Sequence, residues 1–295
     1  MITKQLQIGH TTLSTTSNTV LTREPDREKT LLIDYLSVSF IDAAVADVAN
    51  YLFPNLDLLV QKSFANGFAT VLTNGKIFLH YGSDNDVVLL VIQSKGCRFL
   101  ESLPLYTWQT FLQKLFDIDK YIEIDHFNFK RFDIAVDSFV KDTLTPNRVR
   151  RSFSSGLITS RFHTIRLIEE ATISSKTSKG DSIYFGSRSS DLYLVIYNKA
   201  LESRIQGEWF RTEIRCKNEQ ANRLIVTLLD EPEDFSTCVA DLLQNRIQFR
   251  SSVHRKSEIR RSIFAVWYSR YLKYLRQQSL YSGTTATVQG GDLDD

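Results

Sequence analysis

Apolar and polar residues alternate along three segments of this chain. The segments are Lys130–Asp137, Asp191–Lys199 and Trp209–Cys216. Alternate side chains of an extended strand share a face, so each segment predicts a strand with one apolar and one polar face. The polar faces collect charged and phenolic groups, namely Arg131, Asp133, Asp137, Tyr193, Tyr197, Lys199, Arg211, Glu213 and Arg215. The sequence therefore predicts a sheet with core on one side and carboxylates, cations and phenols on the other.

The first half of the chain shows strand and helix patterns of its own. A β-rich run predicts a strand over Leu31–Phe40, and apolar residues at helical spacing predict a helix over Asp42–Leu52, with Asp42 as its N-cap. Turn signals, of which Asn74-Gly75 is the strongest, separate three predicted antiparallel strands at Phe68–Asn74, Lys76–Gly82 and Asp86–Ser94. A further helix is predicted over Leu105–Asp117.

A similar order of elements returns in the second half. A strand over Phe127–Phe139 precedes a helix that begins near Thr145-Pro146, and strands follow at Arg161–Glu170, Ser182–Phe185, Leu192–Lys199 and Glu208–Lys217. The predicted fold class is α+β, a curved and mainly antiparallel sheet system of two similar halves with flanking helices. A helical C-terminal region follows, with helices at Asn218–Asp230, Asp234–Leu243 and Ile259–Gln278.

Composition is that of a globular protein. The 295 residues are 42% hydrophobic and 24% charged, enough to bury a sizeable core. Three cysteines without a C-x-x-C pair argue against a disulfide framework or a zinc knuckle and favour a reducing cytoplasm. No signal peptide and no apolar run of membrane-spanning length is visible, so no membrane partner is expected.

Positive charge is unevenly distributed along the chain. The net charge is only +2, but residues 143–167 hold five arginines and no acid, and residues 246–276 hold nine Lys or Arg against the single acid Glu258. Aromatic residues interleave the second stretch, a mixture that suits phosphate neutralisation and base stacking. The alternative is a solvated helix face beside an aromatic core. Two such stretches around an acidic strand site favour a nucleic-acid partner.

The polar strand faces carry the residue types of phosphodiester chemistry. Asp133, Asp137 and Glu213 offer hard oxygen ligands for Mg²⁺ or Mn²⁺, and a tyrosine offers an oxygen nucleophile. Guanidinium groups suit phosphate. The structural alternative is a ladder of ion pairs in which Asp133 and Asp137 bind Arg131 and Arg211. Serine-hydrolase and phosphate-loop motifs are absent from the sequence.

Several strings of the chain resemble the replication initiation factor family in order and spacing. This family holds rolling-circle plasmid initiators of the staphylococcal type and related relaxases of conjugative elements. The resemblance covers roughly residues 31–275, and its strings are Asp34–Ser37, Gly96–Glu101, Arg131–Asp137, Ile183–Asp191, Ile196–Lys199, Arg211–Arg215, Phe249–Ser251 and Trp267-Tyr268.

The resemblance implies a site-specific DNA nickase that works through a 5′-phosphotyrosine and leaves a 3′-OH primer. It favours Tyr197 as the nucleophile, assisted by Lys199, with Tyr184 as the runner-up. A phenol is a weak nucleophile at neutral pH, so a divalent cation is expected to activate it. The residues expected to contact DNA are Arg131, Arg188, Arg211, Arg215, Arg260, Arg261, Arg270 and Lys273.

Composition and periodicity predict how the chain is organised, and the resemblance implies which partners it binds. We expect a flexible leader (1–28), a catalytic nickase domain (29–217), a helical and basic DNA-binding region packed on it (218–281) and a disordered tail (282–295). The expected partners are duplex origin DNA with a hairpin or cruciform, a host helicase, DNA polymerase and a second copy of the chain, in a bacterial cytoplasm. A conjugative relaxase with the same chemistry, and a non-catalytic DNA-binding repressor or initiator, remain alternatives.

Overall fold

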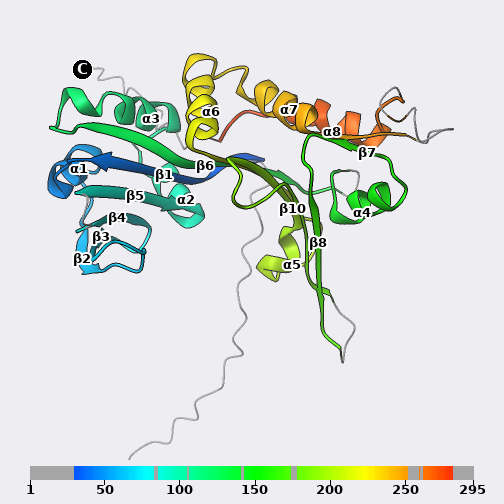
Figure 1. Cartoon of the computed structure of the whole chain (residues 1–295), viewed down its shortest axis with the longest axis horizontal. Helices are drawn as coiled ribbons and strands as arrows, with labels where there is room; N and C mark the ends of the chain where they lie inside the picture. The colour runs from blue at the N-terminus through cyan, green and yellow to red at the C-terminus, as the bar shows by residue number, and fades with distance from the viewer. Residues whose placement is uncertain are drawn as a thin grey trace, which may run out of the picture.

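Ten antiparallel strands form one sheet through the middle of the molecule (Figure 1). The computed structural model describes residues 30–82, 86–104, 106–140, 143–173, 178–251, 259 and 262–281. The order of the strands across the sheet is β2-β3-β4-β5-β1-β6-β11-β10-β9-β8. The predicted leader and tail, at residues 1–28 and 282–295, lie outside the described residues.

Two similar halves meet at the central pair of strands, β1 (Leu31–Ile41) and β6 (His126–Ser138). In the first half β1 leads to α1 (Val45–Leu52) and then to four strands, the last of which pairs with β1; these strands are β2 (Leu59–Lys62), β3 (Thr70–Thr73), β4 (Ile77–Tyr81) and β5 (Val87–Gln93).

The second half repeats this path. Strand β6 leads to α4 (Pro146–Ser154) and, after the short strand β7 (Ile158–Ser160) of a separate sheet, to four strands of the large sheet, the last of which pairs with β6. These strands are β8 (Ile165–Ala171), β9 (Ser178–Phe185), β10 (Leu192–Asn198) and β11 (Phe210–Lys217). The predicted fold class of two similar halves is confirmed, because the same order of strand, helix and antiparallel strands occurs on each side of the β1–β6 pair.

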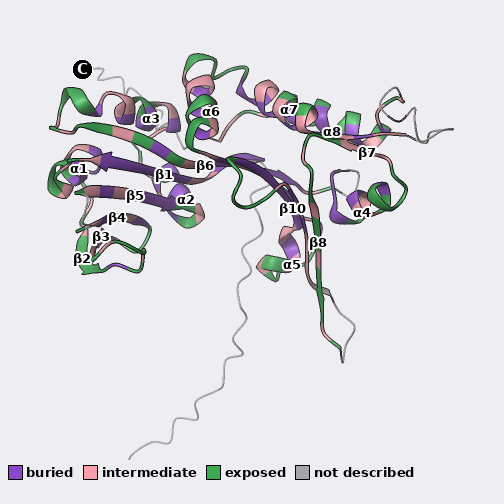
Figure 2. Cartoon of the chain, viewed as in Figure 1, coloured by how far each residue is buried: buried purple, intermediate pink, exposed green. Residues whose placement is uncertain are grey.

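Helices cover one face of the central strands. Helix α6 (Asn218–Asp230) packs on β6 and β11 with Ala221, Leu224, Ile225 and Leu228 buried. Further helices extend this layer, namely α3 (Trp108–Phe116), α7 (Phe235–Arg246) and α8 (Val266–Arg276). The central strands are buried along most of their length, as Figure 2 shows. Burial of the apolar strand faces under these helices supplies the main driving force for folding.

Local signals explain several helix starts and correct one. Helix α3 begins after Thr107, whose side chain forms a reciprocal capping box with Thr110, and α4 begins after the N-cap Thr145 with Pro146 in its first turn, as predicted. The prediction of Asp42 as N-cap is wrong. Helix α1 starts at Val45 after Ala44, and Asp42 has a left-handed φ of 52° in the turn before it.

Other elements escaped the sequence patterns. They are the edge strand β2, helices α2 (Ser94–Glu101) and α5 (Lys199–Ser203), and the two-stranded sheet of β7 (Ile158–Ser160) with β12 (Ile247–Phe249). The predicted helix over Ile259–Gln278 starts too early. Phe264 is extended and bridges Arg250, so the helix begins at Val266. Within the described ranges, no helix has the length and apolar character that crossing a membrane requires.

Candidate active site

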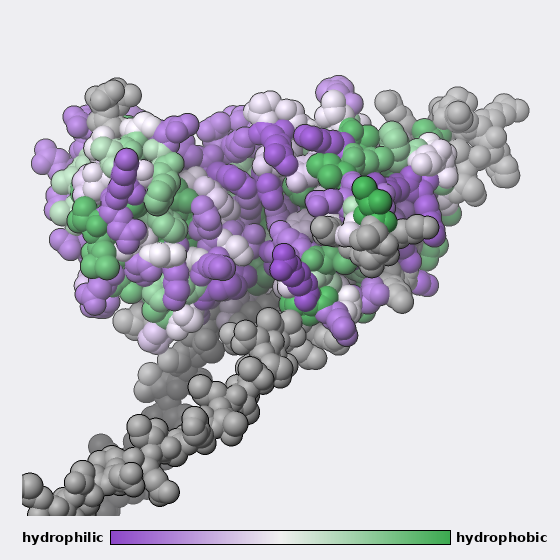
Figure 3. All heavy atoms as spheres, turned by 90° about the horizontal axis from the view of Figure 1, so that it is seen from below, coloured by the Kyte–Doolittle hydropathy of each residue, from purple (hydrophilic) through white to green (hydrophobic). Residues whose placement is uncertain are grey.

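The polar side chains of β6, β11 and β10 form cross-strand rows on the sheet face opposite α6. One row contains Tyr197, Arg211 and Asp137, and another contains Tyr193, Arg215 and Asp133. Glu213 lies between these rows, opposite Val195 and Ala135. Seen from the side opposite α7 and α8, hydrophilic side chains gather across the middle of the molecule (Figure 3). The structure therefore places Asp133, Asp137, Glu213, Arg211, Arg215 and Tyr197 on one face of the sheet, as the alternation predicts.

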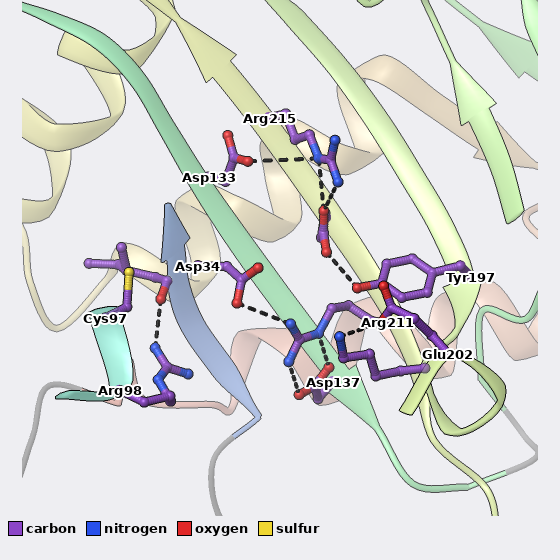
Figure 4. A network of polar contacts seen from close by, with 12 residues as sticks. Asp34, Cys97, Arg98, Asp133, Asp137, Tyr197, Glu202, Arg211 and Arg215 are labelled. Carbon is purple, nitrogen blue, oxygen red and sulfur yellow. Dashed lines mark hydrogen bonds and ion pairs between the residues drawn. The ribbon is translucent and has the colours of Figure 1, made fainter. Parts of the chain in front are cut away.

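Arg211 links two carboxylates from different strands. Its Nε and Nη2 donate to Asp137 Oδ1 and Oδ2 at 2.6 and 2.7 Å, and its Nη1 donates to Asp34 Oδ1 of β1 at 3.0 Å (Figure 4). Arg211 and Asp137 are almost fully buried. Burial is the largest single influence on Asp34 and opposes its ionisation, but Arg211, together with the hydrogen bond of Ser94 and the charges of Arg98 and Lys199, lowers the pKa of that carboxyl. This bidentate pair fixes the guanidinium rigidly.

Glu213 joins the phenol of Tyr197 to Arg215. The Tyr197 hydroxyl donates to Glu213 Oε1 at 2.6 Å, while Arg215 donates to Oε2 from Nε at 2.8 Å and from Nη2 at 2.5 Å (Figure 4). Burial, reinforced by the neighbouring Glu213 charge, raises the pKa of Tyr197 above its usual value. The resting phenol is therefore protonated and donates its hydrogen bond to a buried carboxylate group.

Asp133 is bound by two arginines. Arg131 donates to it from Nε at 2.9 Å and from Nη2 at 2.5 Å, and Arg215 Nε lies 3.7 Å from Oδ2. Burial nevertheless raises the pKa of Asp133 to about 6, against the pull of both arginines. The guanidinium of Arg131 also stacks over Tyr35, 4.2 Å from the ring centre. The Asp133–Arg131 and Asp137–Arg211 pairs are those of the structural alternative stated above.

The three predicted metal ligands do not converge on one point. Asp133 and Asp137 are four residues apart on one strand, or about 13 Å. An aspartate oxygen lies only about 3–3.5 Å from its own Cα, and Mg²⁺ binds oxygen at about 2.1 Å. Among the described residues no group of three His, Cys, Asp or Glu side chains could hold a metal ion. These carboxylates do not fit a single site, and metal binding by any one of them stays a prediction.

Comparison with known proteins shows to which family the chain belongs. The model of the replication initiation factor family matches residues 127–284, which is more than half of the chain. The chain belongs to the replication initiation factor family. A family match over this range includes β6, β10 and β11, so it covers the polar rows of the candidate site.

Two similar proteins extend this result. The chain is 28% identical over 238 residues to the Bacillus subtilis (strain 168) protein "Putative DNA relaxase NicK", a match that covers 74% of the chain and 64% of that relative. The chain thus spans less than two thirds of the relative's length. The rolling circle replication initiator protein from Geobacillus stearothermophilus superposes with a TM-score of 0.75 at 24% identity, covering 85% of this chain and 97% of that one. This likeness shows a shared fold.

Three tyrosines share the site face in this member of the replication initiation factor family. Tyr193 and Tyr197 are buried, and Tyr184 on β9 is half-buried against them. Tyr193 accepts a hydrogen bond from Arg215 at 3.3 Å, and Arg188 lies 4.8 Å above the ring of Tyr184. In the described part of the chain, Tyr197 is the one of the three whose hydroxyl donates to a carboxylate.

Lys199 does not lie on the predicted strand face. Strand β10 ends at Asn198, whose side chain caps α5, and Lys199 is the first residue of that helix. The prediction failed because Asn198 supplies an N-cap that ends the alternation. The ammonium group of Lys199 lies 5.6 Å from the ring centre of Tyr197 and pairs with Glu202.

The predicted DNA contacts are scattered over the molecule. Arg131, Arg211 and Arg215 hold site carboxylates, while Arg188 lies above Tyr184. Arg270 and Lys273 are exposed on α8. Arg260 and Arg261 lie outside the described residues. The sequence interpretation missed Asp34 as a site residue, although a carboxylate within the apolar run of β1 was an available signal.

Proposed function

We propose that this chain is a rolling-circle replication initiator that nicks and rejoins one strand of origin DNA through a tyrosine. The observation that carries the proposal is the hydrogen bond from the Tyr197 hydroxyl to buried Glu213, on a polar sheet face, in a member of the replication initiation factor family. A phenol that faces a fixed carboxylate has the arrangement that nucleophilic catalysis requires.

Nicking transfers a phosphoryl group from a DNA oxygen to the phenol oxygen. Tyr197 Oη attacks the phosphorus, the bond from phosphorus to the 3′ oxygen breaks, and the phenol proton passes to Glu213 Oε1. The departing oxygen takes a proton from solvent and becomes a 3′-OH, and the 5′ phosphate stays esterified to Tyr197. The reverse reaction rejoins the strand. Because the pKa of Tyr197 is raised, the proton acceptor must already be in place before attack.

Positive charge lies close to Tyr197 where the phosphate would sit. Lys199 lies beside the Tyr197 ring and can meet the phosphate, whereas Arg211, opposite Tyr197 in the next strand, is buried and bound to Asp137 and Asp34. A guanidinium or ammonium group stabilises the negative charge that develops on the phosphate oxygens during transfer. A bound Mg²⁺ or Mn²⁺ would add positive charge at these oxygens. Use of such an ion stays a prediction of family membership, and the steps above involve this chain's own residues.

A second candidate function is mobilisation of DNA as a conjugative relaxase. It is favoured by the 28% identity to the Bacillus subtilis protein that bears the name of a relaxase. The nicking chemistry is the same for an initiator and a relaxase, so the partner proteins distinguish the two functions. An initiator needs a polymerase to extend its 3′-OH and a helicase to unwind the template, whereas a relaxase delivers its covalent strand to a transfer apparatus. Dimerisation and a hairpin or cruciform at the origin also stay predictions.

The decisive experiment is trapping of the covalent intermediate. The purified chain is incubated with supercoiled plasmid that carries the DNA adjoining its gene, in Mg²⁺ or Mn²⁺. We expect open circles that retain protein through denaturation, and a tryptic peptide containing Tyr197 with a linked nucleotide in mass spectrometry. Binding without any nick would identify the chain as a non-catalytic DNA-binding protein instead.

A further inference from the structure

The two short strands β7 and β12 form a second, two-stranded sheet at the end of the molecule next to α8 (Figure 1). Ile247 pairs with Ser160 and Phe249 with Ile158. Ile247 and Phe249 are fully buried, and Phe249 packs on Trp267 and Tyr268 of α8. One face of the two-stranded sheet is therefore committed to the core, and the other face is turned away from α8.

The outward face of this sheet is built from polar and cationic residues. Residues two apart on a strand share a face, and directly opposed residues of an antiparallel pair do so too. Gln248 pairs with Thr159. Just beyond the two strands, the backbone N–H of Arg161 donates to the carbonyl of Arg246, the last residue of α7, at 2.9 Å, so these two arginines are neighbours at the end of the sheet. The outward residues are Thr159, Arg161, Arg246, Gln248 and Arg250, which we call the arginine face.

The arginine face places like charges together without an internal counter-charge. Arg161 is exposed, and neither Arg161 nor Arg246 forms an ion pair with any described residue. Like charges directly opposite one another in a sheet destabilise it. A bound anion would remove this repulsion. The arrangement is therefore explained if the arginine face binds an anionic ligand when the protein functions.

Arg250 is held in a fixed orientation at the other end of the face. Its Nη1 donates to the carbonyl of Ser262 at 2.7 Å, its Nη2 donates to Gln248, and its guanidinium stacks 4.5 Å from the ring centre of Phe264. Thr159 Oγ1 also donates to Gln248, at 3.2 Å. A guanidinium held in advance loses little side-chain entropy when a ligand arrives.

The surface over the arginine face is hollowed. One hollow of about 350 Å³ is lined by the five residues of the face together with Ser160 and Asn245. A second, of about 410 Å³, shares Arg161 and Arg246 and continues past Phe162 to the turn at Gly186 and to Leu192, with the carboxylate of Asp191, which accepts a hydrogen bond from Asn218, at that end. The two hollows meet at the opposed arginines, and Leu192 is the first residue of the strand that carries Tyr197.

We propose that the arginine face binds the phosphate backbone of duplex DNA at a distance from the nicking tyrosine. This inference rests on the proposed function and adds a binding surface to it. Guanidinium, hydroxyl and amide groups are those that contact phosphate and sugar. The five residues of the face include no aromatic side chain, and Phe162 in the second hollow packs against Phe185, so a stacking platform of the kind used by single-strand binders is missing here and duplex is the favoured occupant.

The arginine face lies at a distance from Tyr197, so DNA bound there would be held away from the bond that is cut. Leu192 borders the second hollow, and Tyr197 lies five residues further along the same strand, about 16 Å away. Tyr197 is also on the opposite face of that strand from Leu192, because an odd number of steps separates them. DNA that follows the hollows would pass the end of β10 before it reaches Tyr197.

The test measures binding apart from nicking. Arg161→Gln with Arg246→Gln is compared with Arg223→Gln with Lys120→Gln, a control that removes the same charge from two exposed residues paired elsewhere. The probes are a labelled 30-base-pair duplex of arbitrary sequence and a labelled single strand of the same length, without divalent metal. Anisotropy titrations over a range of salt give affinity and its salt slope.

We expect the double variant to lose at least about fivefold in duplex affinity at low salt and to flatten the salt slope by about 0.9 per arginine. The control should match the wild type within about twofold. An unchanged slope, an equal loss in the control, or a loss confined to the single strand would overturn the proposal. The single variant Arg161→Gln, at an exposed side chain, repeats the test if the double variant unfolds. If the double variant loses duplex affinity as expected but the wild type does not nick DNA, the proposed function is refuted and the proposed binding surface is not.

Discussion

The Tyr197 hydroxyl reaches Glu213 diagonally across two strands. The residue directly opposite Tyr197 is Arg211, and Glu213 lies two positions along the neighbouring strand, yet the hydroxyl and Oε1 are 2.6 Å apart. Arg211 is turned to Asp137 and Asp34, which leaves Glu213 as the partner of the phenol. Diagonal neighbours are within reach of an aromatic side chain, so the sheet register sets up this contact.

Replacing Tyr197 by Phe should stop nicking and leave DNA binding intact. We expect the nicking rate and the yield of covalent adduct to fall by at least about 10³-fold, because the attacking oxygen is removed. The loss of one buried hydrogen bond should cost about 1–2 kcal/mol of unfolding free energy. The measurement is adduct formation on denaturing gels, with anisotropy for binding.

Tyr193→Phe is the matched control, since Tyr193 lies on the same face and contacts Arg215. It should nick at a rate close to that of the wild type. Loss of the adduct in Tyr184→Phe, with full activity in Tyr197→Phe, would assign the nucleophile to Tyr184.

Replacing Glu213 by Gln should slow the chemical step while preserving side-chain size. An amide cannot take the phenol proton, so we expect single-turnover nicking at saturating DNA to fall by about 10²–10⁴-fold. The dissociation constant for DNA should change little, which separates a role in proton transfer from a role in binding. Equal nicking rates for the two proteins would exclude Glu213 as the proton acceptor.

Arg211 should be essential for stability, because it holds two buried carboxylates. Arg211→Met leaves Asp137 and Asp34 without their cation, and we expect the unfolding free energy to fall by about 3–5 kcal/mol in denaturant titrations. Asp137→Leu leaves Arg211 with Asp34 and should cost less. The double variant should be more stable than the sum of the two losses predicts, whereas strict additivity would show that the pair is not coupled.

Asp133 should make the protein less stable as the pH rises from 4 to 6. Burial raises the pKa of Asp133 from 3.8 to about 6 in the folded state. Between these values the unfolded chain loses the proton first, so ionisation favours unfolding as pH rises. Relative to Asp133→Asn, the wild type should lose on the order of 1–3 kcal/mol across this window. Parallel pH profiles for the two proteins would contradict the raised pKa.

Removal of divalent metal should abolish nicking, and Mg²⁺ or Mn²⁺ should restore it. Asp133 lies about 13 Å along its strand from Asp137, which shares a row with Tyr197. We therefore expect Asp133→Asn to leave the metal concentration for half-maximal nicking within about twofold of the wild type. A tenfold increase in that concentration would show that Asp133 is a ligand after all.

The strand faces and the duplicated order of elements could be read from the sequence. Alternation is a property of the local backbone, so it showed that Asp133, Asp137, Tyr197, Arg211 and Glu213 each lie on a polar strand face. The resemblance of short sequence strings to the replication initiation factor family then suggested a function for those polar faces. The spacing of Asp133 and Asp137 was also present in the sequence, and the same strand geometry that put them on one face keeps them apart.

Tertiary structure alone decided which charges meet. Arg211 binds Asp137 and Asp34, which are 74 and 177 residues away along the chain, and that choice depends on the register between distant strands. The three-residue strands β7 and β12 are too short to show alternation, so the arginine face emerged only from their pairing. Local pattern fixes the direction of a side chain relative to its own strand, whereas its partners are fixed by where burial of the apolar faces brings the other strands.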